Sequence, residues 1–382
     1  MAASRADAVI IGGGVIGASI AYHLTLRGLT PIVFERDLLG SGNTGRSAGG
    51  IRAQFTSEVN IRLSLHSIAF FERFQEILGM DAEFHQCGYL FLATTPAHLQ
   101  HFKSRIEFQR RYGVEVSLIG REEVASRWPF LRTDDVLGAT YSAKDGIAGP
   151  YEVTIAFANA AKQRGAVFHE RAAVSGIIAD GGRVRGLDTS LGRFESDIVV
   201  VAAGPDTPAL LRPLGVEVPI TSYRRHLYMT EKFAQIPDDI PLTIDSGTGL
   251  YFRKETGGLM LGMVDKSDPP TMSMVVDDGY LEKLVDAALG RVPILEQANI
   301  LNGWAGLYDT TPDHHAILGR VEGLSGLFLA TGFSGHGFMH SPAVGVVIAE
   351  IIADGAAKTI NVDGLSFGRF AAGALMEETN VI

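Results

Sequence analysis

The chain has 382 residues, 46% of them hydrophobic and 20% charged, with one cysteine and a formal net charge of −10. This length predicts a protein of two or more domains. The basic residues form no runs, which argues against nucleic acid as a partner. The single cysteine, Cys87, excludes an intramolecular disulfide and a cysteine-cluster metal site, so we expect no metal.

Nothing in the sequence predicts export or membrane insertion. It contains no stretch of about 18 consecutive apolar residues, and the first predicted strand begins too close to Met1 for a cleaved signal peptide. A lone cysteine also fits a reducing compartment. We therefore expect a cytoplasmic protein without a membrane span, and peripheral membrane contact stays open.

The most informative pattern lies at the start of the chain. An apolar strand is followed by glycines, a helix over residues 15–27 and a second strand over residues 31–34 that ends in an acid. This order is typical of a dinucleotide-binding unit, in which the glycines allow a tight turn, the helix N-terminus faces phosphates and the acid binds ribose. The alternative is a tight turn that binds nothing, and the motif does not distinguish FAD from NAD. The predicted nucleotide-binding residues are Gly12, Gly14, Val15, Ile16, Gly17 and Glu35.

The middle of the chain alternates between two kinds of structure. Residues 40–50 are rich in glycine and predict a loop around a ligand, and a long amphipathic helix follows over residues 58–78. Residues 84–140 depart from βαβ alternation, with a strand at 89–92 and a polar helix at 98–112, so they predict a second domain. A helix at 151–164, hairpins over 174–194 and a strongly apolar strand at 198–204 then return to the first domain.

Strands dominate again from residue 220 to 264, with a hairpin near 256–258, and a buried strand at 326–332 precedes a last helix. The fold class is therefore α/β, with a Rossmann-like nucleotide-binding domain interleaved with an antiparallel-sheet α+β substrate domain. We assign residues 1–83, 141–205 and 311–382 to the first domain and residues 84–140 and 206–310 to the second.

The segment 332–342 indicates which nucleotide is bound. Its glycines precede Ser341, which suits an N-cap, and Pro342, which suits the first position of a helix. The positive end of a helix starting there would stabilise the negative charge of a reduced flavin, which favours a flavin over a nicotinamide. The alternative is that the segment is only a short connection.

Four dispersed motifs together resemble a known family. They are residues 10–17, 200–204, 311–313 and 332–338, in the order found in the D-amino-acid-oxidase-like FAD oxidoreductases, which include sarcosine oxidases, glycine oxidases and flavin subunits of proline dehydrogenases. The resemblance covers essentially the whole chain. It implies a bound FAD roofed by an antiparallel sheet, and hydride transfer from the carbon beside an amine nitrogen to flavin N5.

The resemblance also suggests site residues. It implies catalytic roles for Arg52, Tyr251 and His336; Arg52 could instead lie on the surface or bind FAD phosphate, and Tyr251 could pack in the sheet. Further cofactor-binding residues implied by the resemblance are Arg36, Arg46, Ser47, Ala48, Val174, Ala203, Gly204, Gly332, Gly335, His336, Gly337, Phe338 and Met339.

Three departures from the sarcosine oxidases matter. Gly306 stands where those enzymes have a flavin-linking cysteine, so FAD should be noncovalent. Met260 and Met339 stand where they have lysines that promote oxygen reaction and hold substrate. The electron acceptor, oxygen or a carrier, therefore stays open.

The expected partner is a small amine or amino acid. The chain could work alone or in a homo- or hetero-oligomer, for example as the flavin subunit of a hetero-oligomeric dehydrogenase. A flavin-binding protein without turnover is another reading, and an NAD-dependent dehydrogenase is the least supported because it gives segment 332–342 no role.

Overall fold

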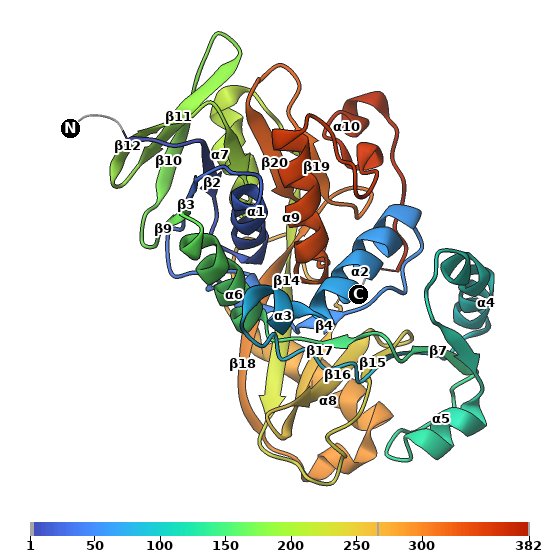
Figure 1. Ribbon diagram of the computed structural model, residues 1–382. Helices are drawn as coiled ribbons and strands as arrows, with labels where there is room; N and C mark the ends of the chain where they lie inside the picture. Colours follow the sequence, from blue (N-terminus) through green and yellow to red (C-terminus); the bar gives the residue numbers. More distant parts are fainter. Residues whose placement is uncertain (1–3, 266, 381–382) are drawn as a thin grey trace.

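The computed structural model describes residues 4–265 and 267–380. A six-stranded sheet forms the centre of the half of the molecule that carries both N-terminal and C-terminal segments (Figure 1). Its strand order is β19-β20-β13-β2-β3-β9, and all neighbours pair in parallel except β19 with β20. The strands are β2 (Ala8–Ile11), β3 (Pro31–Phe34), β9 (Val167–His169), β13 (Val199–Val201), β19 (Ile317–Arg320) and β20 (Leu327–Thr331).

Apolar residues on both faces of this sheet explain its position in the interior. On one face, α1 (Val15–Thr25), α6 (Pro150–Gln163) and α9 (Gly337–Ala353) pack with α2 (Glu58–Phe71) in one hydrophobic core. The other face packs against a four-stranded sheet in the order β1-β12-β11-β10. These strands are β1 (Ser4–Arg5), β10 (Val174–Asp180), β11 (Arg183–Thr189) and β12 (Gly192–Glu195). Strands covered on both faces are expected to be apolar throughout.

An eight-stranded sheet forms the second half of the molecule, in the order β18-β14-β17-β16-β15-β5-β7-β6. It is antiparallel except where β15 runs parallel to β5. The strands are β5 (Tyr89–Ala93), β6 (Ser117–Ile119), β7 (Gly138–Ser142), β14 (Thr221–Thr230), β15 (Leu242–Asp245), β16 (Leu250–Glu255), β17 (Gly258–Met263) and β18 (Ile300–Thr310). Helix α8 (Asp278–Arg291) packs on one face, so the other face is free to meet the first half.

The small elements join these layers. A two-stranded sheet, β4 (Gly50–Ile51) with β8 (Gly146–Ile147), lies between the halves. Helices α4 (Pro96–Arg111) and α5 (Arg121–Arg127) lie beside β5, β6 and β7 (Figure 1). Short helices follow α2 and β13: α3 (Phe74–Leu78) and α7 (Thr207–Leu211). The predicted fold class is confirmed. No helix among the described residues is long and apolar enough to cross a membrane.

Some predicted boundaries were wrong. The helix expected over residues 58–78 is divided into α2 and α3, and α4 begins at Pro96, where Thr95 caps it, instead of at residue 98. The last helix begins at Gly337, so Pro342 lies inside it and not at its first position. Burial of Phe338, Met339 and His340 extends α9 toward its N-terminus, because tertiary packing outweighs the local signal of the proline.

The hairpin near residue 257 is confirmed: it joins β16 to β17, with positive φ at Thr256 and Gly257. The assignment of residues to two domains stays a prediction. Residues 138–142 form one strand of the large sheet, so the proposed boundary after residue 140 divides β7.

Candidate functional site

Two positions in and after the turn between β2 and α1 require glycine, because a Cβ would clash there. Gly12 has φ +110°, and a Cβ there would lie 2.3 Å from the carbonyl oxygen of Ala202. A Cβ on Gly17 would lie 2.0 Å from the carbonyl oxygen of Gly12. The first glycine therefore permits the tight turn, and the second lets α1 pack closely on it, as a nucleotide-binding turn requires.

The acid at the end of β3 is fixed by backbone donors. The amide of Gly13 donates to Glu35 Oε2 at 2.7 Å, and the amide of Asp37 donates to Oε1 at 2.9 Å. The next residue, Arg36, pairs with Asp206 at 2.9 Å. Each oxygen of Glu35 retains acceptor capacity beside the turn, which suits recognition of ribose hydroxyls.

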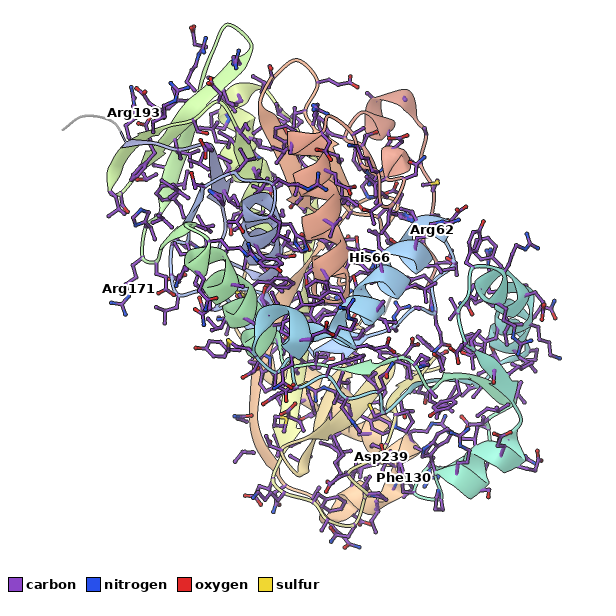
Figure 2. All side chains as sticks on the ribbon, in the orientation of Figure 1. Arg62, His66, Phe130, Arg171, Arg193 and Asp239 are labelled. Carbon is purple, nitrogen blue, oxygen red and sulfur yellow. The ribbon has the colours of Figure 1, made fainter. Side chains whose placement is uncertain are left out.

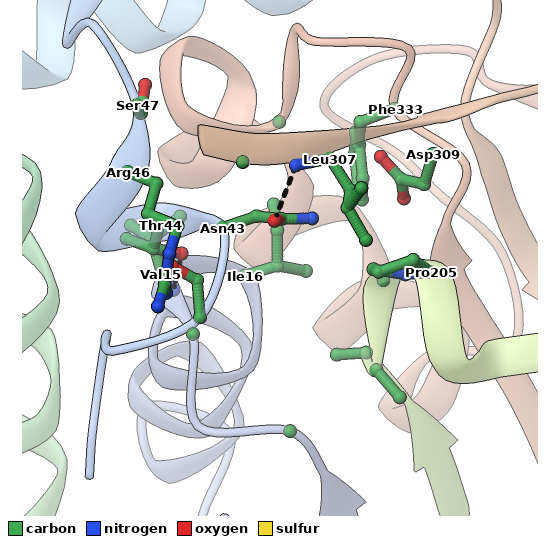
Figure 3. A pocket seen from close by; sticks show the side chains of 18 of the residues that line it. Val15, Ile16, Asn43, Thr44, Arg46, Ser47, Pro205, Leu307, Asp309 and Phe333 are labelled. Atoms are coloured by element: carbon green, nitrogen blue, oxygen red, sulfur yellow. Dashed lines mark hydrogen bonds between the residues drawn. The ribbon is translucent and has the colours of Figure 1, made fainter. Parts of the chain in front are cut away.

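The loop of residues 40–50 lies against the start of α1, as Figure 3 shows for Asn43, Thr44 and Arg46. Thr44 Oγ1 accepts from the amide of Val15 at 3.2 Å. Asn43 Oδ1 accepts from the amide of Leu307 at 2.9 Å, and the Arg46 carbonyl accepts from Trp304 Nε1 at 3.2 Å. The loop is therefore fixed between the nucleotide turn and β18 of the large sheet.

One cavity of about 1170 Å³ runs from the end of β3 to the large sheet. It exceeds the range of roughly 300–1,000 Å³ that is typical of small-molecule sites. At the nucleotide end it is lined by exposed Arg171, which Figure 2 labels at the edge of the molecule. Such a volume suits a dinucleotide rather than a single small substrate.

Nearly all predicted site residues line this cavity. Gly17 and Gly332 do not; Gly332 has φ +69°, and a Cβ there would lie 2.6 Å from Thr311 Cγ2, so both glycines serve packing. The predicted residues that line it are Gly12, Gly14, Val15, Ile16, Glu35, Arg36, Arg46, Ser47, Ala48, Arg52, Val174, Ala203, Gly204, Tyr251, Gly335, His336, Gly337, Phe338 and Met339.

The N-terminus of α9 opens on the cavity. His336 is the N-cap residue, and His336, Phe338 and Met339 are buried cavity-lining residues. The helix has 17 residues and its first turn contains no acid. Its positive end therefore faces the cavity, as predicted from the sequence, although the helix begins at Gly337 instead of Pro342.

The predicted catalytic residues are brought together at the end of the cavity beside the large sheet. Arg52 is 1% exposed, and its guanidinium lies 3.9 Å from the centre of the Phe55 ring. Phe55 in turn packs edge to face with His336 at 4.8 Å. Tyr251, on β16, lines the same cavity and is buried.

The tyrosine and histidine side chains at this end are neutral near pH 7. Burial raises the pKa of the hydroxyls of Tyr89, Tyr251 and Tyr308, so they stay protonated. Burial, reinforced by the charge of Arg52, lowers the pKa of His336 well below its usual range. This end of the cavity therefore contains uncharged hydrogen-bonding groups, and the low pKa of His336 makes its neutral imidazole a weak base.

Sequence reasoning missed Arg225, a cavity-lining residue on β14. Its Cζ lies 5.1 Å from the centre of the Tyr308 ring, and its Nη1 donates to the Arg224 carbonyl at 2.9 Å. Its Nε is buried without a hydrogen-bond partner, and no described side chain forms an ion pair with it. Alternation along a strand could not identify it, because Arg224 and Arg225 are adjacent and only the folded sheet shows which one faces the cavity.

Asp309, on β18, was also missed. It lines the cavity, and its Oδ2 accepts from the amide of Gly332 at 2.9 Å (Figure 3 shows its position near Phe333). Burial raises the pKa of its carboxyl to about 6. An acid here contributes to the wall between the nucleotide turn and the large sheet.

FAD fits this arrangement of residues. The glycine turn with Glu35 suits the adenosine and phosphates, and the N-terminus of α9, which has no acid in its first turn, suits a ring system that becomes negative on reduction. A family model for FAD-dependent oxidoreductases (DAO) matches residues 7–351. The chain belongs to this family of FAD-dependent oxidoreductases. The resemblance inferred from the sequence and the prediction of FAD are thereby confirmed.

Proteins with several different names are similar in sequence to this chain. It is 33% identical to FAD-dependent oxidoreductase domain-containing protein 1 of Xenopus laevis, over 99% of this chain and 85% of that protein. It is 30% identical to human mitochondrial sarcosine dehydrogenase over 92% of this chain, but it spans only 40% of that longer protein.

Two solved structures have the same fold. L-proline dehydrogenase from P. horikoshii is 34% identical, with a TM-score of 0.92, and the match covers 98% of this chain and 100% of that one. Glycine oxidase from Geobacillus kaustophilus is 28% identical, with a TM-score of 0.87, and the match covers 96% of this chain and 99% of that one.

Proposed function

We propose that this DAO-family chain oxidises the C–N bond of an amino acid, or of a secondary amine that carries a carboxylate, to an imine. The single observation that carries the proposal is Arg225, a cation on the cavity wall with an unpartnered Nε and no ion pair among the described side chains. Arg225 is half-buried with its Nε shielded from solvent. Such a cation is stabilised by an anionic ligand, and a guanidinium binds a carboxylate through paired hydrogen bonds. Relatives named proline dehydrogenase, glycine oxidase and sarcosine dehydrogenase support this substrate class.

FAD, when bound, supplies the acceptor for a hydride from the carbon beside the amine nitrogen. The side chains of the chain orient the substrate and exclude water. Arg225 would hold the carboxylate, and the neutral hydroxyls of Tyr251 and Tyr308 can donate hydrogen bonds without competing for its charge. Orientation of the substrate within the cavity accounts for most of the expected rate enhancement.

The substrate nitrogen must enter as a free amine, because its lone pair assists departure of the hydride. His336 is neutral and lies at the start of α9, and the tyrosines remain protonated. We therefore expect kcat/KM to rise with pH until the amine of the free substrate has lost its proton. If the rise of kcat/KM with pH instead has the same pKa for substrates of different basicity, the titrating group belongs to the protein.

The test is anaerobic mixing of the FAD-loaded chain with a panel of amino acids and N-alkyl amino acids, followed at the visible absorbance of oxidised flavin. Each amino acid is matched with the amine that lacks its carboxylate. The proposal predicts that at least one amino acid bleaches the flavin and that its matched amine does so far more slowly. A flavin that stays yellow with every member of the panel would overturn the proposal.

The second candidate is the flavin subunit of a hetero-oligomeric dehydrogenase that passes electrons to a carrier. The high similarity to a protein named L-proline dehydrogenase favours it, as does Met339 on the cavity wall in place of a cation. A cation beside the flavin would stabilise superoxide as oxygen reacts, and methionine cannot. Turnover with an artificial electron acceptor that greatly exceeds turnover with oxygen would favour this candidate.

Localisation in the cytoplasm also stays a prediction.

A further inference from the structure

The last described residues run back from α10 (Arg369–Ala372) to the start of α2 (Figure 1). Residues 371–377 are exposed, whereas Glu378 is only 1% exposed. The amide of Glu378 donates to the carbonyl of Asp313 at 3.1 Å, which fixes the direction of the segment. One acid on an otherwise exposed stretch is therefore inserted into the protein interior.

Glu378 accepts hydrogen bonds from a ring of donors at the N-terminus of α2. Its carboxylate accepts from the amides of Thr56 and Ser57 at 3.0 and 3.1 Å, from their hydroxyls at 2.5 and 2.9 Å, and from Asn60 Nδ2 at 3.2 Å. Burial alone would raise the pKa of this carboxyl, but these hydrogen bonds hold it below its usual value. The N-cap residue Ser57 makes no side-chain cap of its own, so Glu378 caps the helix.

The segment then reaches Arg52. The carbonyl of Asn380 accepts from Arg52 Nη2 at 2.6 Å, and the carbonyl of Gln54 accepts from Arg52 Nη1 at 2.8 Å. Asn380 Nδ2 donates to the same Gln54 carbonyl, and Asn380 N donates to Glu378 Oε1 at 3.0 Å. These contacts join Glu378, Asn380 and Arg52 in one hydrogen-bonded set.

Arg52 has no carboxylate within 4.0 Å among the described side chains, although it is buried and lines the FAD cavity. Its described partners are two carbonyls and the rings of Phe55 and Phe91, whose centres lie 3.9 and 5.6 Å from Cζ. An arginine side chain has several rotatable bonds, so loss of one carbonyl partner would free the guanidinium to adopt other rotamers. The place of this charge therefore depends on the segment that supplies the Asn380 carbonyl.

We propose that Glu378–Asn380 is a positioning strap that fixes the Arg52 guanidinium at the wall of the FAD cavity and so raises the reduction potential of the bound flavin. Glu378 and Asn380 are positioning residues that act through Arg52, and neither lines the cavity. A fixed cation stabilises reduced flavin because reduction adds negative charge to the ring. This inference rests on FAD binding in the cavity and does not depend on the substrate named above.

The experiment is a reductive titration of the FAD-loaded chain against a dye of known potential, without any amine substrate. The variants are Glu378→Gln, Arg52→Met and the double variant, with Glu377→Gln, an exposed neighbour, as the matched control. We expect Glu378→Gln to lower the ratio of reduced to oxidised flavin about threefold to tenfold at a fixed potential, where tenfold is ~30 mV for a two-electron couple. Glu377→Gln should leave the ratio unchanged.

The double variant separates positioning from a structural role. If the strap acts through Arg52, Glu378→Gln has no further effect on the potential once Arg52 is methionine. A wild-type potential in Glu378→Gln, even with a lowered melting temperature, would overturn the proposal, and so would additive shifts in the double variant. If Glu378→Gln fails to fold, Asn380→Ala takes its place, because it removes only the side-chain bond to the Gln54 carbonyl. Asn380→Ala is expected to shift the potential in the same direction. An unchanged potential in that variant would count against the strap.

Failure of this experiment would leave the proposed function intact, because the potential is measured without substrate. Conversely, an enzyme that oxidises none of the amines tested could still show the shift. The two proposals are therefore tested separately.

Discussion

The two ends of the FAD cavity are built in different ways. The nucleotide end uses backbone amides and a tight turn supplied by residues close in sequence, from Gly12 to Thr44. The substrate end gathers Arg52, Tyr251, Tyr308 and Arg225 from distant parts of the chain. One end is therefore defined by backbone shape and the other by side-chain charge. Substitutions at the two ends should accordingly damage different properties: FAD retention at the first and substrate choice at the second.

The largest effect is expected at the nucleotide end. Gly12→Ala forces a Cβ to within 2.3 Å of the Ala202 carbonyl oxygen at a φ of +110°. We expect a loss of about 3 kcal/mol in the free energy of unfolding, and purified protein with little FAD. FAD absorbance per chain and thermal unfolding measure both effects.

Gly42→Ala is the matched control for this prediction. Gly42 also lines the cavity, but an added Cβ would have no atom within 4 Å. It should retain FAD. Equal FAD content in Gly12→Ala and Gly42→Ala would mean that the turn does not bind the nucleotide.

At the substrate end, Arg225→Met should leave FAD bound and remove recognition of the carboxylate. Hydrogen-bonded charge pairs of this kind contribute about 2–5 kcal/mol when one partner is truncated, so we expect kcat/KM for the amino acid to fall about 100-fold. The rate with the matched amine that lacks a carboxylate should hardly change. Steady-state kinetics on both substrates give the ratio.

Arg224→Met is the control, because Arg224 does not line the cavity and pairs with Asp268 and Asp277 instead. It should not alter the preference for the carboxylate even where it lowers stability. If Arg225→Met and Arg224→Met change the preference equally, carboxylate recognition lies elsewhere.

The stability of the FAD-free chain should depend on pH through Asp309, which lines the cavity wall. Burial raises the pKa of Asp309 from 3.8 to about 6, so the folded FAD-free chain binds more protons than the unfolded chain between these values. Its stability therefore falls as pH rises from about 4 to 6 and is constant above that range with respect to this group. Asp309→Asn should be about 2 kcal/mol more stable than wild type at pH 7, with the difference vanishing below pH 4.

Asp265→Asn gives the opposite sign and serves as the comparison. Hydrogen bonds from Lys283 and Ser267 lower the pKa of Asp265 to about 2, so its contribution to stability is present above its unfolded pKa of 3.8 and is lost as pH falls through about 2. That variant should be less stable than wild type at pH 7. Melting temperatures from pH 3 to 8 test both, and a pH-independent difference for Asp309→Asn would contradict the first.

The smallest effect is expected at Cys87, which lies outside the cavity. Gly306 lines the cavity at the position of the flavin-linking cysteine of the sarcosine oxidases, so nothing there can form that bond. Acid precipitation should release all FAD into the supernatant from both wild type and Cys87→Ala. Yellow colour that precipitates with the chain would show a covalent link.

The same contrast explains what the sequence could predict. The turn at Gly12, the acid Glu35 and the apolar strands were predicted because a dinucleotide turn is local and its glycines have a steric reason. Arg225 was missed because its role depends on which side of β14 faces the cavity. The start of α9 was misplaced because Pro342 suggests a helix start, whereas packing of Phe338 determines it.

The most direct test of the account is a crystal structure of the FAD-loaded chain with a carboxylate-bearing substrate analogue. We predict one FAD in the cavity, with its ribose at Glu35 and its ring system between the start of α9 and β14, and the ligand carboxylate within hydrogen-bonding distance of Arg225. A flavin ring remote from β14, or a carboxylate bound away from Arg225, would contradict the account.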